Sequence, residues 1–566
     1  MNVEECHWSH LKNLLHQLYD SHQVSSIVSH IQKYVSAAEH KVNIERKTFT
    51  QNDCMLICYG DHLQNQKPPL QSLAEFYNSN YVNLFNAVHL LPFYPSSSDG
   101  GFSVKDFESV CPQLGTWADI ENFEGNLMFD AVVNHTSCQH KWFKGFAQGL
   151  DEFKDYYISF EHNDNRLEDY KNVTRPRSTP LFTSYNIEGR DQLVWTTFSN
   201  DQVDLNFRNH KILEEWISLI ALYVKEGAKF LRIDATPFLW KKPNTTCANL
   251  NETHIIVKVF RAFLDLYSPD TCLITESNVP HMENIAYFGN GTDEAQIVYN
   301  FSLAPLILHG GFYQNAGILK KWAFNFSHHP QNQVFLNFTS THDGIGMRPL
   351  EGLVDDIDVV AMCEHAQLTG GAVTTRTVGG EEKPYEINST WMSFVFDERL
   401  PPEESANRFV GQHLIALCFP GVPAIYFHNM FGAFNDGDTF IATQHRRDLN
   451  RKRYKKDEFI QLTQEHPFHK MVFEKMSLLL RLRRERSYLS PSAAFSLLET
   501  PDEVFAFSRV AENIKGNFYI NFSKDKQNIF IDGDQSILCS GSSRDSIDGS
   551  RLLLNPFSYC WTESKV

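Results

Sequence analysis

The hydrophobic pattern of the chain alternates between short apolar runs and longer amphipathic stretches. Each apolar run is nearly continuous in Val, Ile, Leu and Phe, as expected for parallel strands that are covered on both faces. The runs lie near residues 55, 82, 129, 229, 272, 297, 334 and 422. Between them are helical patterns such as residues 209–227, where Ile212, Trp216 and Tyr223 share one face. Eight strands with helical crossovers predict an α/β fold of the (β/α)₈ TIM barrel type, and an open doubly wound sheet is the alternative.

The rest of the chain divides into regions of different character. Residues 1–50 carry apolar positions at three- and four-residue spacing and predict a helical N-terminal cap on a barrel that spans 51–489. Residues 137–207, after the third strand, are too many for a simple connection and predict an inserted subdomain. A second excursion fills 344–405. Residues 490–566 contain apolar runs separated by turns and predict a C-terminal antiparallel β domain.

Composition and charge limit the kinds of molecule that the protein is expected to bind. The chain has 566 residues, a net charge of −17 and no basic run, which argues against nucleic acid and favours a neutral ligand. No segment has the length and apolarity of a membrane span, and no secretory signal pattern is evident, so we expect a cytoplasmic protein. A homodimer is compatible with the sequence.

Polar and charged residues follow the predicted strands at their carboxyl ends, where barrels of this type carry their active sites. Three carboxylates are expected to converge there, which is costly unless a function requires it. The strand-end residues are Asp130, Asn134 and His135, Arg232 and Asp234, Glu276, and His342 and Asp343.

Four segments, DAVVNH, FLRIDATPF, ITES and STHD, resemble in this order the short motifs of the α-amylase superfamily, glycoside hydrolase family 13. The resemblance covers about residues 50–460. It implies that Asp234 is the nucleophile, that Glu276 is the general acid/base, and that Asp343 binds ring hydroxyls and stabilises the transition state.

The chemistry of retaining glycosidases requires the same division of roles. One carboxylate must be ionised to attack the anomeric carbon, and a second must be protonated to assist the leaving oxygen. Arg232 lies two residues before Asp234 on the same strand face and can keep it ionised, whereas Glu276 is expected to have a raised pKa. His135 and His342 can donate to sugar hydroxyls, and structural strand-end histidines are the alternative.

Further segments resemble the sucrose phosphorylase branch of this family, which includes glucosylglycerate and sucrose-6-phosphate phosphorylases. They are LLPFYPSSSDGGFSVKDF, HDGIGMRP, PYEIN at 384–388 and HRRDLNR at 445–451. The resemblance implies an ion pair between Asp99 and Arg451 that closes the non-reducing end of a glucosyl site, with Phe102 packed beside the sugar. Such a wall would restrict the donor to one glucosyl unit and exclude internal cleavage of starch. The alternative for Asp99 is a turn-capping role.

The predicted insertion contains the segment TRPRSTPLFTSY at 174–185. The phosphorylase resemblance implies that this loop contributes to phosphate and acceptor binding. Arginine is a natural partner for a phosphate dianion, so we expect Arg175, Arg177 and, in the same segment, Phe182 among the substrate-binding residues. The alternative is that the arginines are surface loop residues.

Together the sequence predicts a retaining glucosyl phosphorylase that acts on a small α-glucoside and inorganic phosphate. The alternatives are an α-glucosidase or transglucosidase with the same machinery and, from another class, an inactive barrel used as a binding subunit. Other members of the family often bind calcium near the asparagine that corresponds to Asn134, but we expect no catalytic metal and no cofactor here. The leaving group stays open between fructose, a phosphorylated fructose and glycerate.

Overall fold

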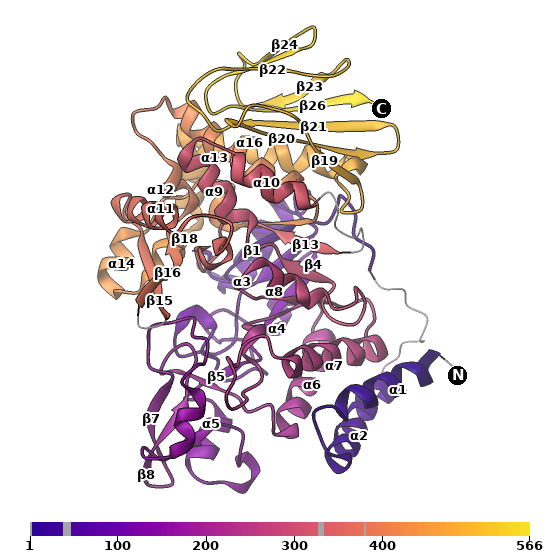
Figure 1. The fold of residues 1–566 in the computed structure, drawn as a ribbon, viewed down its shortest axis with the longest axis vertical. Helices are drawn as coiled ribbons and strands as arrows, with labels where there is room; N and C mark the ends of the chain where they lie inside the picture. The colour runs from indigo at the N-terminus through magenta and orange to yellow at the C-terminus, as the bar shows by residue number, and fades with distance from the viewer. Residues whose placement is uncertain (1–2, 38–46, 327–332, 379–380) are drawn as a thin grey trace.

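A closed barrel of eight parallel strands forms the centre of the molecule (Figure 1). The computed structural model describes residues 3–37, 47–326, 333–378 and 381–566. Around the barrel the order is β1 (Met55–Cys58), β17 (Val422–Tyr426), β13 (Val334–Asn337), β12 (Ile297–Tyr299), β11 (Cys272–Thr275), β10 (Ala228–Ile233), β4 (Asn126–Ala131) and β3 (Ala87–Leu90). All eight predicted strands are therefore confirmed, and the open sheet is excluded.

The barrel strands are short and buried, and the helices outside them bury one apolar face. Every residue of β1, β3, β11, β13 and β17 is buried. Helix α6 (His210–Lys225) begins after Asn209, whose side chain accepts the backbone N–H of Lys211. The predicted stripe of α6, including Ile212, Trp216 and Tyr223, is buried. The period of the pattern thus places this helix against the barrel as expected.

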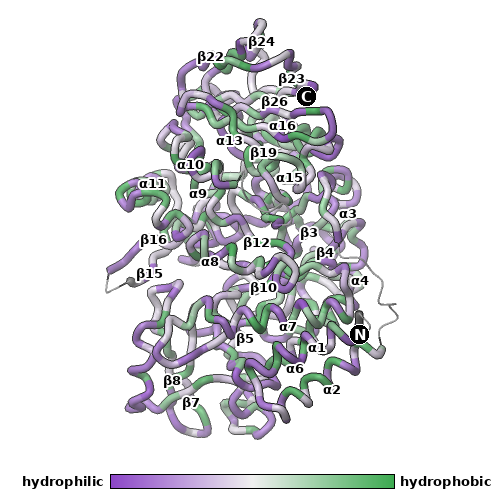
Figure 2. The backbone as a smooth tube through the Cα atoms, turned by 45° about the vertical axis from the view of Figure 1, so that its right-hand side comes forward, coloured by the Kyte–Doolittle hydropathy of each residue, from purple (hydrophilic) through white to green (hydrophobic). Residues whose placement is uncertain are grey.

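Two helices near the N-terminus pack on the outside of the barrel. They are α1 (Val3–Leu15), which contacts α7 (Asn251–Tyr267), and α2 (Ser21–Ala37), which contacts α6 and α7 (Figures 1 and 2). The hydroxyl of Tyr19, between α1 and α2, donates to the carbonyl of Phe207 at 2.7 Å. Residues 38–46 of the predicted cap lie outside the described residues.

Two long segments between barrel elements lie at the carboxyl end of the barrel, one between β4 and β10 and one after β13. Between β4 and β10 the chain forms α5 (Lys141–Ala147), a pair of strands, β5 (His135–Ser137) with β9 (Gln202–Asp204), and a three-stranded antiparallel sheet of β6 (Ser159–Phe160), β8 (Arg190–Trp195) and β7 (Phe182–Ile187). After β13 it forms β14 (Ile345–Gly346), α11 (Asp356–Leu368), a hairpin of β15 (Ala372–Val378) with β16 (Glu381–Asn388), and α12 (Trp391–Val395). Both excursions contribute residues to one cavity, described below.

The C-terminal region is built from antiparallel sheets. Helices α13 (Pro402–Cys418) and α16 (Pro467–Arg484) pack together beneath it. The larger sheet has β19 (Ala494–Leu497), β20 (Val504–Ala511), β21 (Ile514–Asn521), β26 (Tyr559–Lys565) and β23 (Ser536–Ser540), and the smaller has β22 (Gln527–Phe530), β25 (Arg551–Leu554) and β24 (Ser546–Asp548). Within the described ranges, no helix has both the length and the apolarity needed to cross a membrane.

Candidate active site

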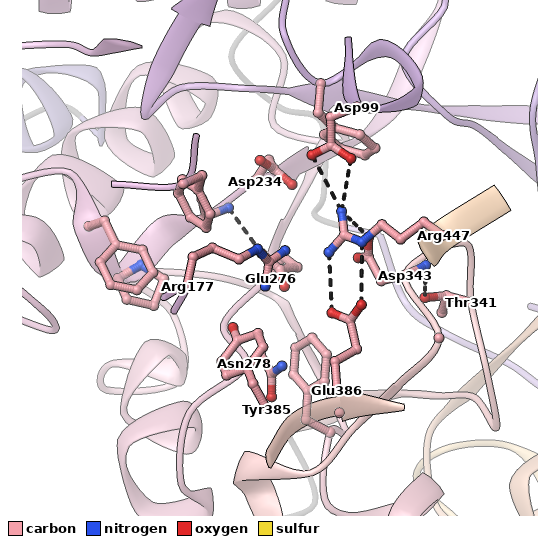
Figure 3. Close-up of a pocket in the computed structure, with 18 of the residues that line it drawn as sticks. Asp99, Arg177, Asp234, Glu276, Asn278, Thr341, Asp343, Tyr385, Glu386 and Arg447 are labelled. Carbon is pink, nitrogen blue, oxygen red and sulfur yellow. Dashed lines mark hydrogen bonds and ion pairs between the residues drawn. The ribbon is translucent and has the colours of Figure 1, made fainter. Parts of the chain in front are cut away.

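One cavity at the carboxyl end of the barrel brings most of the predicted site residues together (Figure 3). The predicted residues that line it are Asp99, Phe102, His135, Arg177, Asp234, Glu276 and Asp343. Three further predicted residues are buried and contact the carboxylates of the lining. Arg232 contacts Asp234, His342 contacts Asp343, and Arg451 contacts Asp99 and Asp343. The carboxyl ends of β10, β11 and β13 supply the three carboxylates, as the barrel architecture requires.

Asp234 follows β10 and is held by an arginine from the same strand. Nη1 of Arg232 lies 2.7 Å from Oδ1 of Asp234 and also pairs with Asp130, whose other oxygen lies 2.7 Å from Nε2 of His89. All of these side chains are buried or nearly so. One guanidinium therefore compensates two buried carboxylates, and Asp234 is fixed in a single orientation.

Glu276 is held by the backbone that follows Asp234. Ala235 has a left-handed conformation with φ of 53°, and its N–H donates to Oε2 of Glu276 at 3.0 Å. Burial raises the pKa of both Asp234 and Glu276, although Arg232 opposes the shift at each. Both shifts favour the protonated form of the carboxyl group. Because Arg232 bonds directly to Asp234, we assign the proton to Glu276, the arrangement that nucleophile and acid require.

Asp343 is ionised by a different set of neighbours. Its Oδ1 lies 3.0 Å from Nη1 of Arg447, 3.3 Å from Nε2 of His342 and 3.6 Å from Nη2 of Arg451. Burial alone would raise the pKa of Asp343, but Arg447, His342 and Arg451 outweigh burial and lower it. Its side chain keeps 27% of its surface exposed, so it can still contact a ligand in the cavity.

The predicted wall at Asp99 contains a second arginine. Oδ1 of Asp99 lies 3.7 Å from Nη1 of Arg451, and 3.2 Å from Nη1 of Arg447. Asp99 has a positive φ of 50° within the turn that precedes Phe102. The ring of Phe102 lies flat on that of His342, with centroids 5.1 Å apart. The predicted pair is present, but the arginine closer to Asp99 is Arg447.

The two predicted sugar-binding histidines are buried and neutral. Nε2 of His135 lies 3.1 Å from the carbonyl of Phe102 and 3.2 Å from Nε2 of Gln202, which also donates to Asp99. Burial lowers the pKa of His135, and it lowers the pKa of His342 to about 3. A neutral imidazole can donate or accept a hydrogen bond, as recognition of hydroxyl groups requires.

The structure separates the three residues predicted from the insertion. Arg177 lines the cavity, with its guanidinium carbon 5.2 Å from the centre of the Tyr385 ring. Arg175 is half-buried and outside the cavity lining, and its Nε and Nη2 have no hydrogen-bond partner among the described residues. The expectation for Phe182 requires a correction. Phe182 begins β7 and packs edge-on against Trp195, in the apolar cluster of the insertion.

Several residues of the site were not selected from the sequence. Arg447 and Glu386 line the cavity, and both lie inside the motifs HRRDLNR and PYEIN, so their charges were the available signal. Lys241 is buried, with Nζ 2.9 Å from Oδ1 of Asn134 and 2.9 Å from Oδ2 of Asp204. An ammonium group thus takes the oxygens that a cation near Asn134 would need, so these residues do not fit a calcium ion.

Comparison with known proteins agrees with this geometry. The family described as Alpha amylase, catalytic domain, matches residues 83–343. Glucosylglycerate phosphorylase of Escherichia coli (strain K12) is 37% identical over 548 residues, which cover 94% of this chain and 96% of that protein. Sucrose phosphorylase of Agrobacterium vitis is 27% identical over 524 residues, covering 87% and 99%. The crystal structure of sucrose 6F-phosphate phosphorylase from Thermoanaerobacter thermosaccharolyticum has the same fold, with a TM-score of 0.72, 23% identity and coverage of 83% and 94%.

The chain therefore belongs to the α-amylase family, glycoside hydrolase family 13. Within this family it is similar to the glucosylglycerate and sucrose phosphorylases, and this confirms the branch that the sequence motifs predicted.

Proposed function

We propose that the protein is a retaining glucosyl phosphorylase that converts a small α-glucoside and inorganic phosphate into α-glucose 1-phosphate. The observation that carries the proposal is that Asp234, Glu276 and the cationic side chain of Arg177 line the same cavity. The similarity to phosphorylases over nearly the whole chain supports the same reaction. The presence of all three carboxylates in one cavity argues against an inactive binding subunit.

In the first half-reaction, a carboxylate oxygen of Asp234 attacks the anomeric carbon while the bond to the leaving oxygen breaks. The proton of Glu276 moves to that oxygen, so the leaving group departs as an alcohol. The product is a glucosyl ester of Asp234. The positive charge that develops on the ring is stabilised by ionised Asp343.

In the second half-reaction, an oxygen of phosphate attacks the anomeric carbon and displaces Asp234. The carboxylate of Glu276 accepts the proton of hydrogen phosphate, and two inversions give net retention. The phosphate anion is repelled by the carboxylates of the cavity, so a cation is needed near its path. Arg177 supplies this charge from the wall of the cavity.

The closed end of the cavity restricts the donor. Asp99, Arg447 and Arg451 form a network of ion pairs there, which leaves no continuation for a longer chain of sugars. The relatives named glucosylglycerate phosphorylase are 37% identical to this chain, whereas the sucrose phosphorylases are 26–27% identical. That difference favours glucosylglycerate as the donor. A cytoplasmic location suits an enzyme that consumes inorganic phosphate and releases a sugar phosphate, and the homodimer stays a prediction.

The test is product partitioning at a fixed donor concentration while phosphate is varied. Glucosylglycerate, sucrose and glucosylglycerol would be compared, with glucose and glucose 1-phosphate measured separately. We expect glucose 1-phosphate to dominate as phosphate rises, with glucosylglycerate as the preferred donor. Release of free glucose alone at every phosphate concentration would replace this proposal with the α-glucosidase.

A further inference from the structure

Arg447 joins three carboxylates that come from three different parts of the chain. It belongs to the short helix η8 (Arg446–Asn450). Its Nη1 lies 3.0 Å from Oδ1 of Asp343 and 3.2 Å from Oδ1 of Asp99. Its Nη2 and Nε lie 3.2 Å and 3.3 Å from the two carboxylate oxygens of Glu386 (Figure 3). The guanidinium is therefore fixed from one side by a bidentate contact and faces the cavity with its other edge.

Strand β16 contacts the turn at Asp343 in two ways. Asn388 lies two residues after Glu386, on the same strand face, and its Nδ2 donates to the carbonyl of Asp343 at 3.1 Å. Gly344 has a φ of 104°, and a Cβ atom at this position would lie 2.2 Å from the carbonyl oxygen of Ile387. The turn therefore packs closely against β16. Asn388 fixes the main chain of Asp343, and Arg447 fixes its carboxylate.

The second arginine of the wall is held by other contacts. Nε of Arg451 donates to the carbonyl of His342 at 2.9 Å, and its guanidinium nitrogens lie 3.6 Å and 3.7 Å from the oxygens of Asp343 and Asp99. Its distances to both carboxylates are longer than those of Arg447. Arg447 contacts Oδ1 of Asp343, and a carboxylate has lone pairs on both oxygens, so Oδ2 stays available to sugar hydroxyls.

We propose that Arg447 is a positioning residue for Asp343, and that Glu386 sets the orientation of Arg447, so that strand β16 controls the fit of the glucosyl site. The inference rests on one part of the proposed function, the transfer of a glucosyl group to Asp234. Whether phosphate or water then accepts this group does not affect it.

The test compares Glu386→Gln and Arg447→Lys with Glu382→Gln, an exposed glutamate on the same strand that serves as the matched control. The measured reaction is release of the leaving group from the donor, irrespective of the acceptor. Both test variants are expected to lower kcat by about 10- to 100-fold with a smaller change in KM, because a displaced Asp343 weakens the transition state more than the ground state. The control is expected to match the wild type.

A second readout separates positioning from a general structural role. In a double-mutant cycle, Arg447→Ala and Glu386→Ala should be less than additive.

Two results would overturn the inference. These are additive effects in the cycle, or losses confined to KM. The proposed function is tested separately, by measuring how the glucosyl group of the wild-type enzyme is divided between phosphate and water. A hydrolase that shows the expected behaviour of Arg447 would uphold this inference while refuting the phosphorylase.

Discussion

The ammonium group of Lys241 lies 2.9 Å from the carboxylate of Asp204 in the interior of the protein. It also donates to Asn134, which precedes the site residue His135. The pair therefore links β9, at the end of the insertion, to the loop after β10. A buried charge that loses its partner is strongly destabilising, so the contact has a measurable effect on folding.

We predict that Lys241→Met lowers the free energy of unfolding by about 3–5 kcal/mol, because Asp204 is left buried without a cation. Urea unfolding monitored by fluorescence measures this change in the free energy of unfolding. The control is Lys242→Met, which breaks an exposed pair with Glu252 and should cost less than about 1 kcal/mol. A chelator should not change the stability of the wild type. Equal effects of the two variants would contradict the prediction.

Asp234→Asn should lower kcat by at least about a thousandfold, because the attacking charge is removed while the shape of the side chain is kept. Arg232 retains its contact with Asp130, so the unfolding midpoint should change little. Steady-state kinetics and thermal unfolding of the same preparation check both parts. More than a tenth of wild-type activity in the variant would refute the assignment of the nucleophile.

Glu276→Gln should distinguish donors by their leaving groups. General acid catalysis contributes about 10²- to 10⁴-fold, and a loss of this size is expected with a glucoside whose leaving group needs a proton. Glucosyl fluoride needs no proton, so formation of the glucosyl-enzyme from it should be far less affected. Rapid-quench measurement of the first turnover with each donor is the experiment. Equal losses on both would indicate that Glu276 has a structural role.

Arg177→Ala should raise the KM for phosphate by about 10- to 100-fold, the value of a lost hydrogen bond to a charged group. The fraction of donor that is hydrolysed should increase, while formation of the glucosyl-enzyme stays nearly unchanged. Arg175→Ala should have a smaller effect, because Arg175 lies outside the cavity lining. Arg190→Ala, an exposed arginine of the same insertion, is the control. An unchanged KM in Arg177→Ala would remove this residue from the phosphate site.

Buried histidines should make the fold sensitive to acid. Burial lowers the pKa of His140, His342 and His428 to about 3 and that of His413 to about 4. The unfolded chain binds these protons near pH 6.5 and the folded chain does not, so stability should fall as the pH drops from about 6.5 to 4. Each histidine contributes up to about 1.4 kcal/mol per pH unit. Asp234 and Glu276, with raised pKa values, act in the opposite direction.

The experiment is urea unfolding across this pH range for the wild type and for His413→Gln. His413 is buried between Thr339 and the carbonyl of Phe409, away from the cavity lining. The slope of stability against pH should be smaller in the variant. A wild-type unfolding midpoint that is independent of pH would contradict the prediction.

Local patterns predicted the barrel because each strand is a continuous apolar run and each crossover has a helical period. The same reasoning located the strand-end carboxylates, since the carboxyl ends of parallel strands meet at one opening. It did not select the Arg447–Asp99 contact, which joins residues 348 positions apart. A charged residue in a loop carries no local signal for which distant carboxylate it meets.

Phe182 shows a different limit of sequence reasoning. Its position near Arg177 suggested a shared role, but neighbouring residues in an extended segment can face different surroundings. Whether an aromatic side chain faces a ligand cavity or a local core depends on the sheet that its strand joins. For Phe182 that sheet places the ring against Phe160 and Trp195.

The helices α1 and α2 are synthesised long before the surface on which they pack. Tyr19, Ser26 and His30 bond to Phe207, Glu214 and Ser218, and each of these pairs is separated by 188 residues. At about 5–20 residues per second, a ribosome needs roughly 10–40 s to reach the partners. During that interval the apolar faces of both helices are exposed to the surroundings of the nascent chain. Docking of this segment must therefore wait until residues 207–218 have been synthesised, and until then its apolar faces are accessible to chaperones and proteases.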